Sequence, residues 1–151
     1  QARVDIGQVG QVTWVNSPLL QALAEADFIP GIAPIARDAA GEKLNVNADT
    51  AAGHVAAATK AEKLVLVSDT HGIRAKKEDP ASLLRSVTKA HIQQLIAEKQ
   101  IGEGMLPKVE SCIIALDAGV KKAHIIDGRF PHALLLEIYS DAGVGTEILL
   151  G

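Results

Sequence analysis

The stretch Leu64-Val65-Leu66-Val67-Ser68-Asp69-Thr70-His71-Gly72 decides the fold. Leu64 to Val67 form a continuous apolar run that ends in Ser68 and polar loop residues, which is typical of a buried parallel strand and the loop at its carboxyl end. Residues 123–127 form a second buried run. Helical patterns alternate with such runs over residues 60–151, so the sequence predicts an α/β fold with a largely parallel sheet.

Further elements are predicted on both sides of this stretch from periodicity and capping. Toward the N-terminus we expect a hairpin of two short strands, a helix capped by Ser17, an irregular apolar segment, a return strand and an alanine-rich helix (3–15, 17–27, 28–35, 43–46 and 51–61). Toward the C-terminus we expect helix starts at Asp79-Pro80, Thr88 and Pro131, a helix closed by Gly119 (106–118) and a last strand (146–150).

Length and composition exclude several function classes. A chain of 151 residues with 48% hydrophobic residues can bury a full core without disulfides or metal. A net charge of −3 and few aromatic residues disfavour nucleic acids and membrane surfaces as partners. No apolar run approaches the ~18 residues of a membrane span. The single Cys112 excludes an internal disulfide, and we expect a cytoplasmic protein.

Two loops at carboxyl ends of predicted strands could bind a ligand, because ligands of open α/β sheets bind there. They are residues 68–74 and 100–108. In the second loop, Gly102 and Gly104 let backbone N–H groups approach an anion, and Lys108 follows in the first turn of a helix. This suits a polyphosphate, although a tight turn followed by a solvated lysine explains the local pattern as well.

A polar segment, Asn45-Val46-Asn47-Ala48-Asp49-Thr50, interrupts apolar surroundings where a strand becomes a helix. It is either a helix cap, with Asp49 stabilised by the helix dipole, or a cluster that binds substrate and organises charge. The charged run 76–79 is interpreted as a solvated loop.

Metal and thiol chemistry are not indicated. The five histidines have neither HxH nor HExxH spacing and form no ligand pattern with Cys112, so we expect no zinc site. Cys112 itself is interpreted as a small buried residue.

Six segments together resemble the C-terminal half of the acetylglutamate kinase family, in order and spacing, over essentially the whole chain. They are GQVGQV (7–12), FIP with IAPI (28–30, 32–35), NVNAD (45–49), LVSDTHGI (66–73), GEGMLPKV (102–109) and HIIDGR (124–129).

The resemblance implies a three-layer αβα sandwich of the amino-acid-kinase type, with residues 1–62 in the amino-acid substrate domain and 63–151 in the ATP-binding domain. It implies phosphorylation of the side-chain carboxylate of N-acetyl-L-glutamate by ATP in arginine biosynthesis. Lys108 and Asp49 would be catalytic. Asn45 and Asn47 would bind substrate. Mg²⁺ would be held mainly through phosphates. The nucleotide would contact Ser68, Asp69, Thr70, His71, Gly72, Ile73, Arg74, Gln100, Ile101, Gly102, Glu103, Gly104 and Met105.

Residues 127–146 resemble the arginine-inhibited members of the family. There Glu137, Gly143 and Gly145 would contact arginine, and the full-length protein would be a homo-oligomer. An ordinary helix-to-strand connection is the alternative interpretation. His71 stands where the family commonly has proline.

The family also has an N-terminal strand, a lysine and a glycine pair that would precede Gln1. We therefore expect the chain to be a fragment that binds ATP weakly, if at all, and does not turn over acetylglutamate alone. Two alternatives stay open. One is a related kinase acting on an aminoadipate derivative in lysine biosynthesis, and the other is a nucleotide- or arginine-binding module without catalysis.

Overall fold

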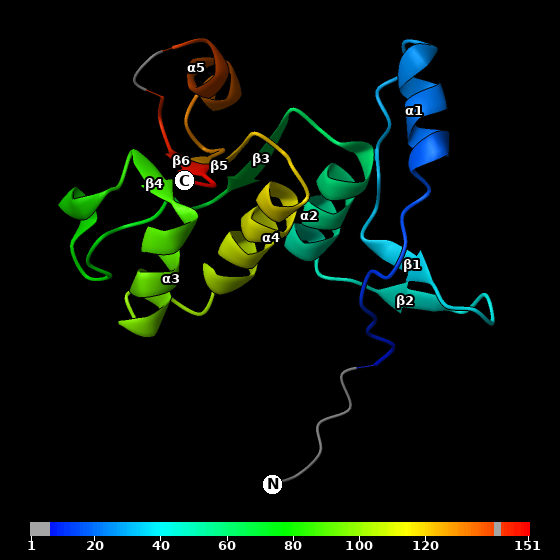
Figure 1. Ribbon diagram of the computed structural model, residues 1–151, viewed down its shortest axis with the longest axis horizontal. Coiled ribbons are helices and arrows are strands. Elements are labelled where there is room, and N and C mark those ends of the chain that lie inside the picture. The colour runs from blue at the N-terminus through cyan, green and yellow to red at the C-terminus, as the bar shows by residue number, and fades with distance from the viewer. Residues whose placement is uncertain (1–6, 141–142) are drawn as a thin grey trace, which may run out of the picture.

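The computed structural model describes residues 7–140 and 143–151. Their elements are α1 (Ser17–Glu25), β1 (Ile35–Arg37), β2 (Lys43–Asn45), α2 (Ala48–Thr59), β3 (Lys63–Ser68), η1 (Pro80–Ser82), β4 (Ser86–Thr88), α3 (Lys89–Ala97), α4 (Leu106–Asp117), β5 (Lys122–Asp127), α5 (Ala133–Tyr139) and β6 (Thr146–Leu149). Figure 1 shows their arrangement. Within the described residues, no helix is long and apolar enough to cross a membrane.

The central sheet has four strands in the order β3-β5-β6-β4. β3 pairs with β5 in parallel, with Leu66 opposite Ile125, and β4 pairs with β6 in parallel. β5 and β6 are antiparallel. Two of the three pairings are therefore parallel, which confirms the predicted α/β fold with a mainly parallel sheet.

Helices cover both faces of this sheet, with α5 on one side and α2, α3 and α4 on the other (Figure 1). Side chains along β5 alternate between the two layers, because successive residues of a strand point to opposite faces. Ala123 and Ile125 join the main apolar core with residues of α4, whereas His124 contacts Glu137 of α5. The three-layer arrangement is confirmed.

The expectation that residues 64–68 are buried on both faces is wrong in part. Leu64 and Leu66 are buried in the core, but Val67 is 59% exposed. β3 lies at the end of the strand order, and α5 packs against β5 rather than against β3. The layer that covers the centre of the sheet therefore leaves one face of β3 open.

The N-terminal part differs from the predicted hairpin over residues 3–15. Residues 7–15 contain no strand, and residues 3–6 lie outside the described residues. Val9 instead forms a parallel bridge with Asn45, and the Gly10 N–H donates to the Asn45 carbonyl at 2.9 Å. The segment runs beside β2, where Gly10 lies so close to Leu44 that a Cβ there would stand 2.7 Å from the end of the leucine side chain.

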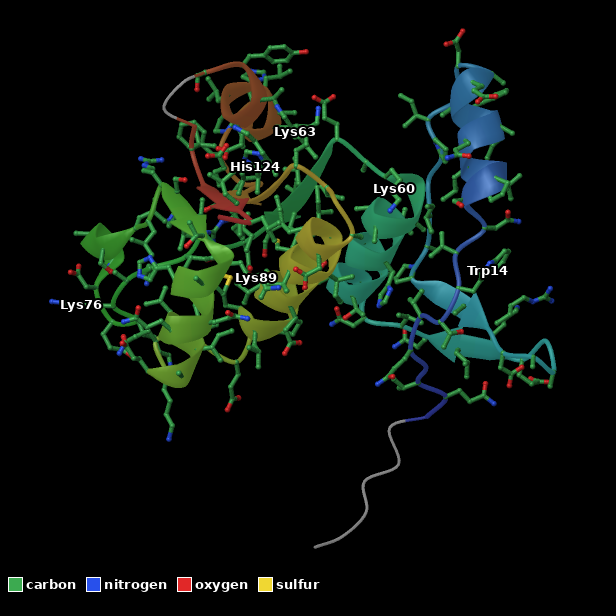
Figure 2. All side chains as sticks on the ribbon, in the orientation of Figure 1. Trp14, Lys60, Lys63, Lys76, Lys89 and His124 are labelled. Atoms are coloured by element: carbon green, nitrogen blue, oxygen red, sulfur yellow. The ribbon has the colours of Figure 1, made fainter. Side chains whose placement is uncertain are left out.

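The helix and strand that follow lie close to their predicted bounds. α1 begins as expected, but its cap is Asn16, which accepts from the Leu19 N–H at 3.2 Å. β1 and β2 form the predicted antiparallel return. Trp14 precedes α1 and is 74% exposed; Figure 2 labels it on this side of the molecule. It lines an apolar cavity together with residues of α1, α2 and the segment before β1.

The predicted helix at Asp79-Pro80 is only the single turn η1. Asp79 does cap it, by accepting from the Ala81 N–H at 2.9 Å. The chain cannot continue as a helix because Ser82 pairs back with Ala75. Thr88 caps α3 and Gly119, at φ +97°, closes α4, as predicted.

Candidate active site

Helices α2 and α4 pack at unusually close range, and this contact positions the site. A Cβ built on Gly53 would lie 2.6 Å from both the carbonyl and hydroxyl oxygens of Ser111. Ser111 is completely buried, and its hydroxyl donates to the Asp49 carbonyl at 2.5 Å. The glycine in α2 thus brings the first turns of the two helices together.

The close contact joins the two residues predicted to be catalytic. Lys108 Nζ lies 2.9 Å from Asp49 Oδ2 and 3.2 Å from Oδ1. The two side chains are 18% and 23% exposed, so the pair is partly shielded from water but reachable. A cation near the start of α4 is disfavoured by the helix dipole, whereas Asp49 is favoured in the first turn of α2. The carboxylate therefore pairs with Lys108 at an end of a helix where an anion is attracted.

Cys112 lies one turn further along α4 and is completely buried. Burial raises the pKa of its thiol to about 12, and the nearby charge of Asp49 acts in the same direction. The thiol stays neutral near pH 7 and behaves as the small packing residue that the sequence indicated.

The two loops predicted to bind nucleotide meet around one cavity of about 160 Å³. Its lining includes eight of the predicted residues: Thr70, Gly72, Ile73, Arg74, Gln100, Ile101, Gly102 and Met105. The structure does not place Ser68, Asp69, His71, Glu103 or Gly104 in this lining. Met105 lies at the end of the cavity where α4 begins, one turn before Lys108.

Lys77 also lines this cavity, and sequence reasoning missed it. Its N–H donates to the side chain of Gln100 at 3.3 Å, and its carbonyl accepts from Arg74 at 3.5 Å. Lys77 therefore bridges the two predicted loops. The one signal in the sequence was its nearness to residues 68–74, which the interpretation of a solvated charged run obscured.

His71 faces a different part of the molecule. Its Nδ1 lies 2.9 Å from Asp127 Oδ2 at the end of β5. Arg129 binds the same carboxylate through two side-chain hydrogen bonds, of 2.9 and 2.7 Å. The Arg129 guanidinium and N–H hold the pKa of Asp127 well below its usual range, and His71 adds to this effect. Asp127 thus anchors the middle of the loop that follows β3.

The predicted substrate residues Asn45 and Asn47 differ in their environment. The Asn47 side chain caps α2 by accepting from the Thr50 N–H at 3.0 Å, which matches the capping interpretation. Asn45 ends β2 and is exposed. The backbone of Asn45 is held by Gln8 and Gly10, so its position is fixed.

Comparison with known proteins identifies this arrangement. The amino acid kinase family matches residues 1–127. The chain belongs to this family.

Curated relatives of this amino acid kinase chain are named acetylglutamate kinase. One, from Symbiobacterium thermophilum, is 51% identical over 146 residues, covering 97% of the chain and 50% of the relative. Another, from Moorella thermoacetica, is 48% identical over 98% of the chain and 50% of the relative. The resemblance inferred from the six segments is confirmed. The chain spans about half the length of the curated relatives it matches.

Two solved structures share its fold. One is N-acetylglutamate synthase from Neisseria gonorrhoeae, in complex with coenzyme A and L-arginine, which is 25% identical with a TM-score of 0.86. The match covers 98% of this chain and 34% of the synthase chain. The other is carbamate kinase from Giardia lamblia bound to AMP-PNP, which is 20% identical with a TM-score of 0.67. The match covers 91% of this chain and 45% of the carbamate kinase chain. The second comparison concerns the fold alone.

This amino acid kinase chain also has a polar cavity of about 360 Å³, which lies on the α5 side of the central sheet. Lys63 and His124, which Figure 2 labels close to α5, line it together with Glu137 and Gly143. Gly145 is outside the lining and packs against Ile125, with no room for a Cβ. Two of the three predicted effector residues therefore border this cavity.

The Glu137 carboxylate is only 3% exposed and is held from three directions. It lies 2.8 Å from His124 Nδ1 and accepts from the N–H groups of Val144 and Gly145 at 2.7 and 3.0 Å. Burial opposes its charge, but these N–H groups and His124 outweigh burial and lower the pKa of Glu137. Among the described residues, His124 Nε2 is buried without a hydrogen-bond partner.

Proposed function

We propose that this chain carries the nucleotide-binding part and a catalytic charge pair of an acetylglutamate kinase. That enzyme would transfer a phosphoryl group from ATP to the side-chain carboxylate of N-acetyl-L-glutamate, in arginine biosynthesis. The pair Lys108–Asp49 carries the proposal, because Lys108 stands in the first turn of α4, directly after the loop that lines the cavity up to Met105.

The pair suits phosphoryl transfer, which requires positioning and stabilisation of charge on the transferring group. Lys108 would balance the negative charge on that group. Asp49 would orient Lys108, since both of its oxygens lie within hydrogen-bond distance of Nζ. A protein nucleophile is not required for direct transfer, and Cys112, the nearest thiol, is buried and neutral.

ATP would lie with its base against Thr70, Ile73 and Ile101 and its phosphates toward Gly102 and Lys108, where the turn before α4 presents backbone N–H groups. Asn45 would contact the amino-acid substrate. The described residues hold no cluster of three or more His, Cys, Asp or Glu side chains that could bind a metal ion. The Asp49 and Asp127 carboxylates are paired with cations, so a Mg²⁺ ion would be held mainly by phosphate oxygens and water, where it neutralises phosphate charge.

The division into domains stays a proposal. Residues 1–62 would belong to the substrate domain and 63–151 to the nucleotide domain. The contact of α2 with α4 would then join the two domains, with Asp49 on one side and Lys108 on the other.

A chimera tests the proposed activity. In it, this chain replaces the matching half of the acetylglutamate kinase of Symbiobacterium thermophilum, to which it is 51% identical. We expect the chimera to phosphorylate N-acetyl-L-glutamate with ATP, and the 151-residue chain alone to bind ATP weakly and show no turnover. A coupled assay for ADP release measures both.

The same assay separates the alternatives. Preference of the intact native enzyme, rather than of the chimera, for an aminoadipate derivative over acetylglutamate would favour the related kinase of lysine biosynthesis, because half of the chimera comes from an acetylglutamate kinase. A chimera that folds and binds ATP without turnover would contradict the catalytic proposal and favour a binding module.

We also propose that the polar cavity beside Glu137 binds arginine as an inhibitor. The cavity offers carboxylates from Glu137 and Glu147 for a guanidinium group and amines from Lys63 and Lys122 for a carboxylate. One solved neighbour of similar fold, N-acetylglutamate synthase, is in complex with L-arginine. Because Glu137 already accepts hydrogen bonds inside the fold, arginine would add to a carboxylate that is held in place.

Glu137→Gln in the chimera is expected to raise the arginine concentration for half inhibition about tenfold or more, because a charged partner is lost from a shielded site. Glu62→Gln is the matched control, since Glu62 is exposed and its distance to Lys121 is 3.8 Å. Kinase assays at increasing arginine measure the shift. Equal inhibition of wild type and Glu137→Gln would refute arginine binding at this cavity.

A further inference from the structure

The hydroxyl of Thr146 lies where three distant segments of the chain meet. Thr146 begins β6 and is completely buried. Its Oγ1 accepts from the Ile73 N–H at 2.9 Å and donates to the Leu84 carbonyl at 2.6 Å. The Leu84 N–H donates in turn to the Ile73 carbonyl at 2.8 Å. Thr146, Ile73 and Leu84 therefore form a closed ring of hydrogen bonds, the Thr146 ring.

The cavity of about 160 Å³ between the two predicted nucleotide loops is called the nucleotide cavity below, and residues 70–74 form its nucleotide wall. The Thr146 ring holds the base of this wall. Ile73 and Arg74 line this cavity. Next to the ring, Arg74 forms an antiparallel bridge with Leu83, which closes the loop between them. Gly72, at φ +130°, lies so close to the Thr146 hydroxyl that a Cβ there would overlap Oγ1. The hydroxyl therefore sets how far this wall stands from β6.

The other side of Thr146 is tied to the polar cavity. The two preceding N–H groups, of Val144 and Gly145, both donate to Oε2 of Glu137. That carboxylate therefore holds the backbone directly before Thr146. Three consecutive residues thus connect the Glu137 carboxylate to the nucleotide wall, which the sequence separates by more than sixty residues.

We propose that Thr146 is a positioning residue that fixes the nucleotide wall and transmits to it the state of the Glu137 carboxylate. The transmitted effect rests on the proposed function in so far as the two cavities bind nucleotide and effector. Valine has nearly the shape of threonine but can neither donate nor accept a hydrogen bond. Thr146→Val would leave the buried Ile73 N–H and Leu84 carbonyl without this partner, which favours opening of the loop.

Amide hydrogen exchange on the full chain tests the position of the wall without any ligand. In Thr146→Val we expect the Ile73 amide to exchange about tenfold faster, the loss typical of one buried hydrogen bond. Thr146→Ser keeps the hydroxyl and should restore slow exchange. The amides of β5 report global unfolding and should change far less than Ile73. Thr59→Val is the matched control, because the Thr59 hydroxyl bonds only within α2.

The link to Glu137 is tested by combining the substitutions. Glu137→Gln should speed exchange at Ile73 when Thr146 is present and add nothing in combination with Thr146→Val. Unchanged Ile73 exchange in Thr146→Val, equal damage by Thr146→Ser, or independent effects of the two substitutions would overturn the proposal. Absence of ATP binding by the chimera, alongside the expected exchange pattern in the chain, would instead count against the proposed function.

Discussion

Lys108→Ala is expected to lower kcat of the chimera about 10²–10³-fold, the loss typical of removing one group that stabilises transition-state charge. KM for ATP should change much less, because the cavity lining from the two loops stays in place. The effect exceeds that of a surface lysine because Lys108 is only 18% exposed and is fixed by both oxygens of Asp49. Steady-state kinetics with varied ATP measure the changes in kcat and KM separately, and a thermal melt shows whether the variant is folded.

Lys89→Ala is the matched control. Lys89 also pairs with an aspartate, Asp117, at 2.6 Å, but Asp117 is nearly half exposed and lies at the other end of α4. Surface pairs of this kind contribute little, so kcat should stay within about twofold of wild type. An unchanged kcat in Lys108→Ala would remove Lys108 from the mechanism.

Gly53→Ala is expected to lower the free energy of unfolding by about 1–3 kcal/mol, the usual cost of overpacking. Alanine is the better helix former by about 1 kcal/mol, so without a clash the substitution would stabilise α2. Here the substitution is destabilising instead, because the new Cβ would lie 2.6 Å from the carbonyl and hydroxyl oxygens of Ser111, a buried residue. The helices must separate, and kcat should fall as Asp49 moves from Lys108.

Gly31→Ala supplies the control, since a Cβ there would meet nothing within 4 Å. Urea unfolding of both variants gives the two stabilities, and the chimera gives the change in kcat. A Gly53→Ala protein as stable as wild type would show that the contact of α2 with α4 is not as tight as described.

Local signals in the sequence were sufficient for most elements of the sheet and its helices. The strands predicted at 64–68 and 123–127 lie in β3 and β5, and Gly119 marks the end of α4, because burial and capping act over a few residues. The two glycine-containing loops were also predictable, and the family resemblance indicated joint roles for Asp49 and Lys108, although their distance depends on the contact of Gly53 with Ser111.

Features that depend on long-range contacts were not predictable. Residues 7–15 have a strand-like pattern, yet they run beside β2 because Gly10 fits against Leu44. Lys77 is held at the nucleotide cavity by a hydrogen bond to Gln100, 23 residues away, as well as by one to nearby Arg74. The antiparallel pairing of β5 with β6, which places Thr146 beside Ile73, follows from the path of the chain after α5 rather than from any local pattern.

Trp14 gives the protein an intrinsic fluorescent reporter of a single surface. It is the one tryptophan in the sequence, and it stands mostly in solvent beside an apolar cavity formed with α1 and α2. The emission of a tryptophan shifts to shorter wavelength when its ring leaves water. Any polypeptide that covers this side of the molecule, including the other half of the chimera, should therefore shift the emission without a label, while events at the nucleotide cavity should leave it unchanged.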